Sequence, residues 1–144
     1  MKRLSLLLEF LRKEFFFGNM LEKGYFYEKI AQKYVINKGM KIISTNFHSE
    51  FGEVDIIASK DEYLIFIEVR MRKYDSVVLP AESVEKKKQA RIIKTALDFM
   101  SNYHENLQPR FDVLEVINKK GKVYINHISN AFWLDDGLKK EIWQ

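Results

Sequence analysis

Cysteine is absent from this chain of 144 residues, which excludes thiol catalysis, iron–sulfur clusters and cysteine-held zinc, and fits a reducing compartment. Glycine and proline are scarce, at 6 and 2 residues, so loops are expected to be short. No apolar run reaches the roughly 18–20 residues that span a bilayer. The N-terminus starts with basic residues, as a secretory signal does, but Glu9, Arg12 and Lys13 interrupt its apolar stretch. We therefore expect a cytoplasmic protein with no membrane partner.

Signatures of several classes of functional site are missing as well. The sequence contains no Walker motif, no GxGxxG loop and no serine-nucleophile elbow. The three histidines, His48, His104 and His127, are scattered without metal-ligand spacing, and we expect each in a loop or on the surface. None of these classes of site is therefore predicted.

The residues that are present predict secondary structure of both kinds. The composition is 47% hydrophobic and 31% charged, which is typical of a folded domain. Apolar positions at helical spacing predict helices, and short runs rich in Ile, Val, Phe and Tyr predict strands. The expected order is a helix over 4–15, a helix over 21–38 ended by Gly39, strands over 42–47, 54–58 and 63–69, a helix over 83–103 capped by Ser83, and strands over 111–117 and 123–128.

This order predicts one α/β domain spanning residues 1–144. Its expected parts are an N-terminal helical extension at 1–19, a core at 20–128 and a C-terminal tail at 129–144. The apolar stripe of the first predicted helix, from Leu4 to Phe15, needs a surface to pack on, and a second copy of the chain in a homodimer is one candidate.

Positive charge is concentrated in one segment. The chain carries 24 basic and 20 acidic residues, a net charge of +4. Between Arg70 and Lys94 lie eight basic and three acidic residues, a net charge of +5, which leaves −1 for the rest. Such a segment suits a phosphate-facing patch, although charge alone is equally compatible with a solvated helix face.

Two acidic residues interrupt strands that are otherwise apolar. Asp55 lies within EVDIIA and Glu68 near the end of YLIFIEVR, and ionised groups are rarely buried unless they are paired or bound to metal. If the hairpin around Asp61 and Glu62 is symmetric, Asp55 and Glu68 face each other on one side of the sheet, with Arg70 beside them. The spacing suits Mg²⁺ or Mn²⁺ held by carboxylates, and equally an ion-pair cluster of Asp55, Glu68 and Arg70.

The segments GEVDIIA, YLIFIEVR, the basic helix and RFDVLEV, in this order over about residues 24–117, resemble the uncharacterised bacterial YraN family. That family belongs to the restriction-endonuclease-like superfamily and is similar in fold to archaeal Holliday junction resolvases. The resemblance implies an α/β restriction-endonuclease-like fold with a central mixed sheet of about five strands flanked by helices. It also implies a Mg²⁺-dependent endodeoxyribonuclease that acts on DNA, with a branched or flapped substrate and a homodimer as further expectations.

By this resemblance, specific residues receive roles. Asp55 and Glu68 match the metal-binding carboxylates, and Glu28 matches an additional active-site glutamate. Lys88 is expected to act with Arg70 on the scissile phosphate. Arg110 and Asp112 match the start of the next strand, where a structural ion pair is expected. The residues expected to bind nucleic acid are Arg72, Lys73, Lys86, Lys87, Gln89, Arg91 and Lys94.

Arg70 departs from the family pattern, which usually has lysine at this position. Arginine stays protonated, so it can hold a phosphate but cannot act as a base. The metal alone then activates water, or Lys86, Lys87 or Lys88 supplies the amine, or catalysis is weakened. The alternative function is therefore a catalytically weakened or inactive DNA-binding scaffold with the same fold. A third possibility, a protein-binding module that uses the N-terminal helix, predicts no salt-dependent affinity for DNA.

Overall fold

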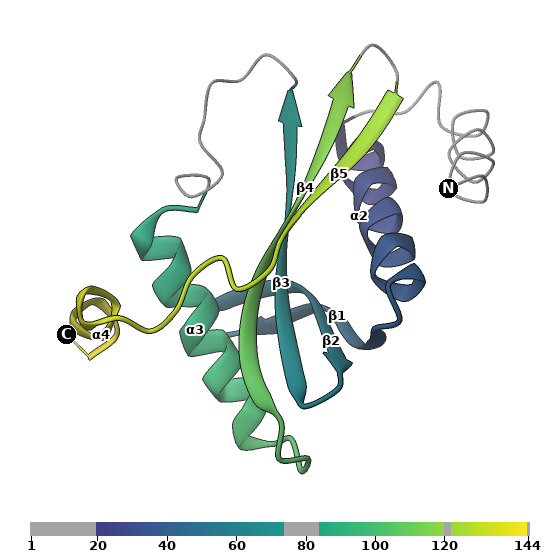
Figure 1. Cartoon of the computed structure of the whole chain (residues 1–144). Coiled ribbons are helices and arrows are strands. Elements are labelled where there is room, and N and C mark those ends of the chain that lie inside the picture. The colour runs from purple at the N-terminus through teal and green to yellow at the C-terminus, as the bar shows by residue number, and fades with distance from the viewer. Residues whose placement is uncertain (1–19, 74–83, 120–121, 144) are drawn as a thin grey trace.

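The computed structural model of the chain describes residues 20–73, 84–119 and 122–143 (Figure 1). The predicted helix over 4–15 and the proposed extension at 1–19 lie outside these described residues. In chain order the elements are α2 (Met20–Asn37), β1 (Lys41–Ser49), β2 (Gly52–Lys60), β3 (Tyr63–Lys73), α3 (Lys86–Ser101), β4 (Gln108–Lys119), β5 (Lys122–Ile128) and α4 (Asp136–Trp143).

The five strands form a single mixed sheet in the order β1-β2-β3-β4-β5. Neighbouring strands pair antiparallel except β3 and β4, which are parallel and are joined through α3. A parallel connection of this kind needs a crossover, and a helix packed on the sheet is its usual form. The α/β class, the mixed sheet and the flanking helices are confirmed, and this architecture is consistent with a restriction-endonuclease-like fold.

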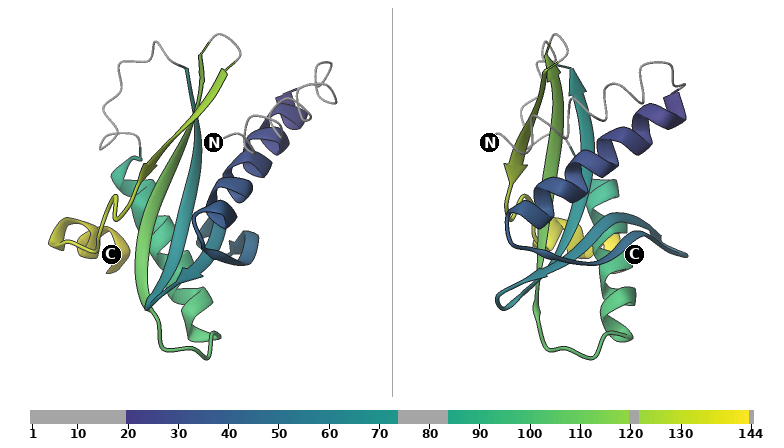
Figure 2. Two further views of the ribbon diagram at one scale, coloured as in Figure 1. Left: turned by 45° about the vertical axis from the view of Figure 1, so that its right-hand side comes forward. Right: turned by 90° about the vertical axis from the view of Figure 1, so that its right-hand side faces the viewer.

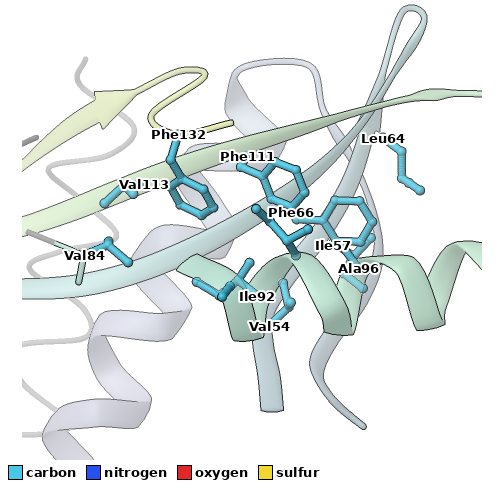
Figure 3. Close-up of a cluster of buried hydrophobic side chains, with 12 residues drawn as sticks. Val54, Ile57, Leu64, Phe66, Val84, Ile92, Ala96, Phe111, Val113 and Phe132 are labelled. Carbon is cyan, nitrogen blue, oxygen red and sulfur yellow. The ribbon is translucent and has the colours of Figure 1, made fainter. Parts of the chain in front are cut away.

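Helices α2 and α3 cover opposite faces of the sheet (Figure 2). On the α3 face, Phe66 of β3 stacks on Phe111 of β4, with ring centroids 5.6 Å apart, and Phe111 stacks on Phe132 at 5.3 Å (Figure 3). On the α2 face, Ala31 and Val35 of the helix pack against alternate residues of β2 and β3 and against Leu114 of β4. The central strands are therefore buried on both sides, which explains their nearly continuous apolar sequence.

The end of α2 follows from one glycine. Gly39 adopts a left-handed φ of +81°, its N–H donates to Ile36, and the N–H of Met40 donates to Val35. These two bonds form a Schellman motif, in which glycine is favoured because it has no Cβ. The prediction that Gly39 ends this helix is confirmed.

The start of α3 differs from the prediction. The helix begins at Lys86 rather than at residue 83, and its N-cap is Glu85, in an extended conformation without a side-chain cap bond. Ser83 is therefore not the N-cap. Val84, which is 5% exposed, belongs to the α3-face core, and this burial accounts for the later start of the helix. Among the described residues, no helix is both long and apolar enough to cross a membrane.

The pairing of β2 with β3 stops before β3 ends. The last paired residues are Ile56 and Ile67, whereas β3 continues to Lys73 alongside β4. Within the described part of the chain, residues 68–73 thus have a partner strand on the β4 side only. An open strand edge therefore begins at Glu68.

Candidate functional site

Asp55 and Glu68 meet where β2 separates from β3. Ile56 pairs with Ile67, so the next position of the register brings Asp55 across from Glu68. The two carboxyl groups share a hydrogen bond. Glu68 lies on the α3 face, because Lys88 of α3 contacts it and Phe66, two residues earlier in β3, belongs to the core on that face. The hydrogen bond to Glu68 brings the Asp55 carboxyl group to the same place. The expected opposition of the two acids across the hairpin is confirmed.

The Asp55 side chain takes the place of a main-chain acceptor. Its Oδ2 accepts a hydrogen bond of 2.7 Å from the N–H of Val69. In an uninterrupted antiparallel ladder this N–H would donate to a carbonyl of β2. The carboxylate thus holds the separating strands together and is itself fixed in position.

Electrostatics at this pair are unfavourable for two ionised acids. Burial raises the pKa of Asp55 to about 7, with further contributions from the charge and hydrogen bond of Glu68 and from the charge of Glu28, while the hydrogen bond from Val69 opposes the rise. Glu68 is only 5% exposed. Two buried acids in contact repel each other when both are ionised, and a bound divalent cation would remove that cost.

Glu28 of α2 contributes to this field without completing a ready-made site. It lies near enough to raise the pKa of Asp55 by its charge. Among the described residues, however, no group of three or more histidine or acidic side chains is arranged to hold a metal ion. Asp55 and Glu68 are thus the two oxygen donors that the fold brings together, with Glu28 close by.

Lys88 links the acidic pair to α3. Its ammonium group forms an ion pair with Glu68, although the lysine side chain is still 44% exposed. The neighbouring Lys86 instead pairs with Asp135, at 3.0 Å between Nζ and Oδ2, and Lys87 is exposed. Of the three lysines that sequence left as candidates for an amine, only Lys88 contacts the acids among the described residues.

Arg70 does not close onto the two acids. Its Nη1 atom is buried and has no hydrogen-bond partner in the described part of the chain. The neighbouring strand offers Glu115 at the same register position, but Oε2 of Glu115 accepts from Nη1 of Arg72 at 3.1 Å and Oε1 accepts from Asn126 at 3.2 Å. The predicted ion-pair cluster of Asp55, Glu68 and Arg70 therefore does not form; Lys88 is the partner of Glu68.

The other basic residues predicted to bind nucleic acid are spread along α3 and β3. Lys87 and Arg91 are exposed, and Lys94 lies 6.0 Å from the centre of the exposed Phe51 ring. Gln89 differs from them: it is 8% exposed and its Nε2 donates to the Val84 carbonyl, so its amide holds the start of α3. Lys73 ends β3, and its side chain lies outside the described part of the structure.

A second polar network lies on the α2 face. The fully buried Asp112 accepts hydrogen bonds from Nε and Nη2 of Arg110, at 2.9 and 2.8 Å, which confirms the expected ion pair. It also contacts Nε2 of His127 at 2.7 Å, and Nδ1 of His127 lies 3.2 Å from the Tyr34 hydroxyl.

His127 was expected in a loop or on the surface, and that expectation is wrong. The histidine lies within β5 and its side chain is 14% exposed. The alternation of the strand carries the missed signal: Ile125, two residues earlier, faces the α2-side core, so His127 faces it too. Burial alone raises the pKa of Asp112, but the hydrogen bonds from His127, Arg110 and the Asn130 amide outweigh it and lower that pKa.

Comparisons with known proteins agree with the earlier resemblance. The model of the family described as "Uncharacterised protein family UPF0102" matches residues 27–116, a range that contains Glu28, Asp55, Glu68 and Lys88. The chain is similar to a UPF0102 protein of Clostridioides difficile, 43% identical over 79% of this chain and 99% of the relative. It is also similar to one of Carboxydothermus hydrogenoformans, 37% identical over 78% and 97%. The chain therefore belongs to the uncharacterised, YraN-like protein family UPF0102.

Proposed function

We propose that this protein binds DNA and cleaves it as a divalent-cation-dependent endonuclease. The observation that carries the proposal is the contact between the carboxyl groups of Asp55 and Glu68 at the separating ends of β2 and β3. Glu68 also touches Lys88, at the start of the basic helix α3. Carboxylates, an amine and a basic surface are groups suited to metal-assisted phosphodiester hydrolysis.

Asp55 and Glu68 would hold Mg²⁺ or Mn²⁺, with Glu28 as a further acid nearby. Two facts support the fit: both donors are hard oxygens, and burial beside a second acid raises the pKa of Asp55 to about 7. A divalent cation bound there lowers the pKa of bound water and stabilises negative charge on a phosphate. The hydrogen bond from Val69 to Asp55 keeps one donor oriented.

Lys88 and Arg70 would divide the tasks that one lysine on β3 performs in the usual family pattern. The Lys88 side chain lies against Glu68, so it would supply the amine beside the acids. The buried Nη1 of Arg70 has no partner among the described residues, so it can donate to a phosphate oxygen. This division answers the difficulty that arginine cannot act as a base.

The exposed basic residues of α3, Lys87 and Arg91, would follow the DNA backbone, together with Arg72, Lys73, Lys86 and Lys94 from the same segment. Gln89 holds the start of α3, and a contact of its own with nucleic acid stays a prediction. A branched or flapped substrate, a homodimer and a cytoplasmic location rest on the resemblance and the sequence alone, and we propose them on that basis.

The test is cleavage of labelled branched DNA with Mn²⁺ by the wild type and by Asp55→Asn and Glu68→Gln. Loss of either carboxylate is expected to reduce cleavage by about 100-fold or more, since both would bind the cation. Glu53→Gln is the matched control, because Glu53 is an exposed acid on the same strand β2 and lies against the exposed His48. Equal cleavage by all four proteins would contradict the proposal.

The alternative, a DNA-binding scaffold that has lost cleavage, is favoured by one observation, the arginine at position 70. A scaffold would bind the same DNA without cutting it, and neither carboxylate variant would change that binding. Arg70→Lys separates the two readings. If the wild type is a scaffold because of Arg70, it does not cleave DNA and Arg70→Lys gains cleavage. If the wild type is the proposed enzyme, it already cleaves DNA, and Lys88→Ala loses that cleavage.

A further inference from the structure

A polar hollow lies on the α2 face of the sheet, at the hairpin end of β2 and β3. Its volume is about 350 Å³, and its walls include Tyr34, Lys38, Lys60, Tyr63, Arg110 and His127. These residues come from the four strands β2, β3, β4 and β5 and from the C-terminal end of α2, so the fold rather than local sequence assembles the hollow. Its volume falls within the range of small-molecule sites, roughly 300–1,000 Å³.

The hollow is separate from the acidic pair. Its α2-face location is opposite to that of Asp55 and Glu68, because Met40 in its wall belongs to the α2-side core. Along β2, Lys60 is five residues beyond Asp55, which corresponds to about 17 Å of strand. A ligand in the hollow would therefore not touch the proposed cleavage site.

Positive charge dominates the walls. Two ammonium groups and one guanidinium group line the hollow, from Lys38, Lys60 and Arg110, and Asp61 is the one acid among its described lining residues. Lys60 is held in place, since its Nζ donates to the Lys38 carbonyl at 2.8 Å. The Lys38 ammonium lies 5.5 Å from the centre of the Tyr34 ring. An anion is the ligand that such walls favour.

The buried Asp112 holds the Arg110 side chain in position at the wall of the hollow. The buried Asp112 binds Nε and Nη2 of Arg110, and the guanidinium lies 5.1 Å from the centre of the Tyr63 ring. Asp112 also binds His127, whose other ring nitrogen lies 3.2 Å from the Tyr34 hydroxyl. One buried carboxylate therefore orients two lining side chains, and a wall set in advance loses little entropy when a ligand binds.

We propose that this hollow binds a small organic phosphate of the size of a nucleoside monophosphate. Lysine and arginine groups supply charge-assisted hydrogen bonds to phosphate oxygens. Tyr34 and Tyr63, which also line the hollow, supply apolar surface for a base or sugar. The inference is independent of the proposed nuclease function, because none of its residues belongs to the acidic pair.

The experiment is calorimetric titration of the full chain with adenosine monophosphate at low salt, followed by competition with inorganic phosphate. We expect saturable binding at one site per chain, displaced by phosphate. The double variant Lys38→Ala/Lys60→Ala is expected to bind about tenfold more weakly or worse, as two exposed ion pairs are lost. The matched control is Lys33→Ala/Lys41→Ala, which removes two exposed lysines on α2 and β1 that do not line the hollow.

Two further measurements distinguish ligand binding in the hollow from DNA binding or cleavage at the acidic pair. Asp55→Asn is expected to bind the nucleotide as the wild type does, whether or not it has lost DNA cleavage. A DNA duplex is expected not to compete. Three results would overturn the proposal. The first is absence of saturable binding at millimolar nucleotide, and the second is equal weakening of binding in the two double variants. The third is full competition by duplex DNA together with a matching loss of DNA affinity in Lys38→Ala/Lys60→Ala.

Discussion

Single carboxylates on the two faces of the sheet have opposite electrostatic situations. Asp55 lies against a second acid, and its pKa is raised to about 7. Asp112 is buried more completely but receives hydrogen bonds from Arg110, His127 and the Asn130 amide, and its pKa is lowered. Burial raises the pKa of both, so the partners decide the sign. Replacing Asp55 and replacing Asp112 are therefore expected to change the free energy of unfolding in opposite directions.

Replacing Asp55 by Asn is expected to stabilise the protein above about pH 7. A carboxyl whose pKa is higher in the folded state contributes stability that is fully present below its unfolded pKa, near 4, and is lost as the pH rises to about 7. Asn removes that loss and can still accept from Val69, so we expect a gain of about 1–3 kcal/mol in the free energy of unfolding at pH 8. Denaturant unfolding between pH 4 and pH 8 measures it.

The control for this change is Glu53→Gln, an exposed acid on the same strand, for which no gain is expected. Added Mn²⁺ is expected to raise the melting temperature of the wild type at pH 8 but not that of Asp55→Asn. If Asp55→Asn is less stable than the wild type at pH 8, the carboxyl pair is not electrostatically strained and this interpretation is wrong.

Replacing Asp112 by Asn is expected to destabilise the protein at pH 7 by about 3 kcal/mol, because Arg110 and His127 lose their buried counter-charge. A lowered pKa means that this contribution is present above the unfolded pKa and disappears as the pH falls below it, so the difference between the two proteins shrinks in acid. Thermal and urea unfolding measure it.

Asp136→Asn is the matched comparison for that change. Asp136 pairs with Lys139 at 3.1 Å, but its side chain is 95% exposed, and such surface pairs contribute little. A similar loss of stability in both variants would contradict the prediction that the buried Asp112 contributes more than a surface ion pair.

Helix α3 contributes to the core, to the acidic pair and to the basic surface. Its buried residues, among them Ile92, Ile93 and Ala96, pack on the sheet, and its first turn places Lys88 on Glu68. The helix also presents Lys87 and Arg91 to solvent one turn apart. A single amphipathic helix thus connects the core, the acidic pair and the basic surface.

The basic surface of α3 predicts a specific salt dependence. If each cation neutralises one phosphate, the slope of log affinity against log salt falls by about 0.9 in magnitude for each residue removed from the contact. Lys87→Ala/Arg91→Ala is therefore expected to lower the slope by nearly 2, measured by fluorescence anisotropy over a salt series. Lys122→Ala/Lys139→Ala, on exposed lysines of β5 and α4, is the control with an unchanged slope. Identical slopes in both double variants would remove α3 from the DNA interface.

The molecule as a whole is a sheet buried between two separate apolar clusters. Val54 and Phe66 belong to the α3-side cluster, whereas Ile56 and Ile67 belong to the α2-side cluster, so one pair of strands contributes to both. Both clusters depend on the same central strands, and we therefore expect the described domain to unfold in one cooperative step.

Phe66→Ala tests this expectation. Phe66 is fully buried and contacts the rings of Phe111 and Phe99, with centroids 5.6 and 6.1 Å away, so its truncation leaves a cavity at the centre of the aromatic stack. We expect a loss of about 3–5 kcal/mol in the free energy of unfolding, with the denaturant slope unchanged. Phe51→Ala, at a ring that is 40% exposed, is expected to cost less than about 1 kcal/mol. Two separate transitions in Phe66→Ala would contradict cooperative unfolding.

Much of the fold could be predicted from local patterns. The periodicity of apolar residues correctly indicated α2, the five strands and most of α3, because burial of one face selects the period of each element. The short turn around Asp61 and Glu62 set the register of β2 and β3, and with it the opposition of Asp55 and Glu68. The start of α3 was misplaced, because a plausible capping residue in sequence carries no information about the burial of Val84.

The sequence by itself thus determined the elements, the hairpin register and the acidic pair, all of which depend on neighbours in the chain. The partners of these groups were decided only by the tertiary structure. Lys88 rather than Arg70 contacts Glu68, and His127 joins the buried Asp112, because the crossover through α3 and the pairing of β4 with β5 bring distant residues together. Side-chain pairing across elements depends on how the layers pack, and no local spacing encodes it.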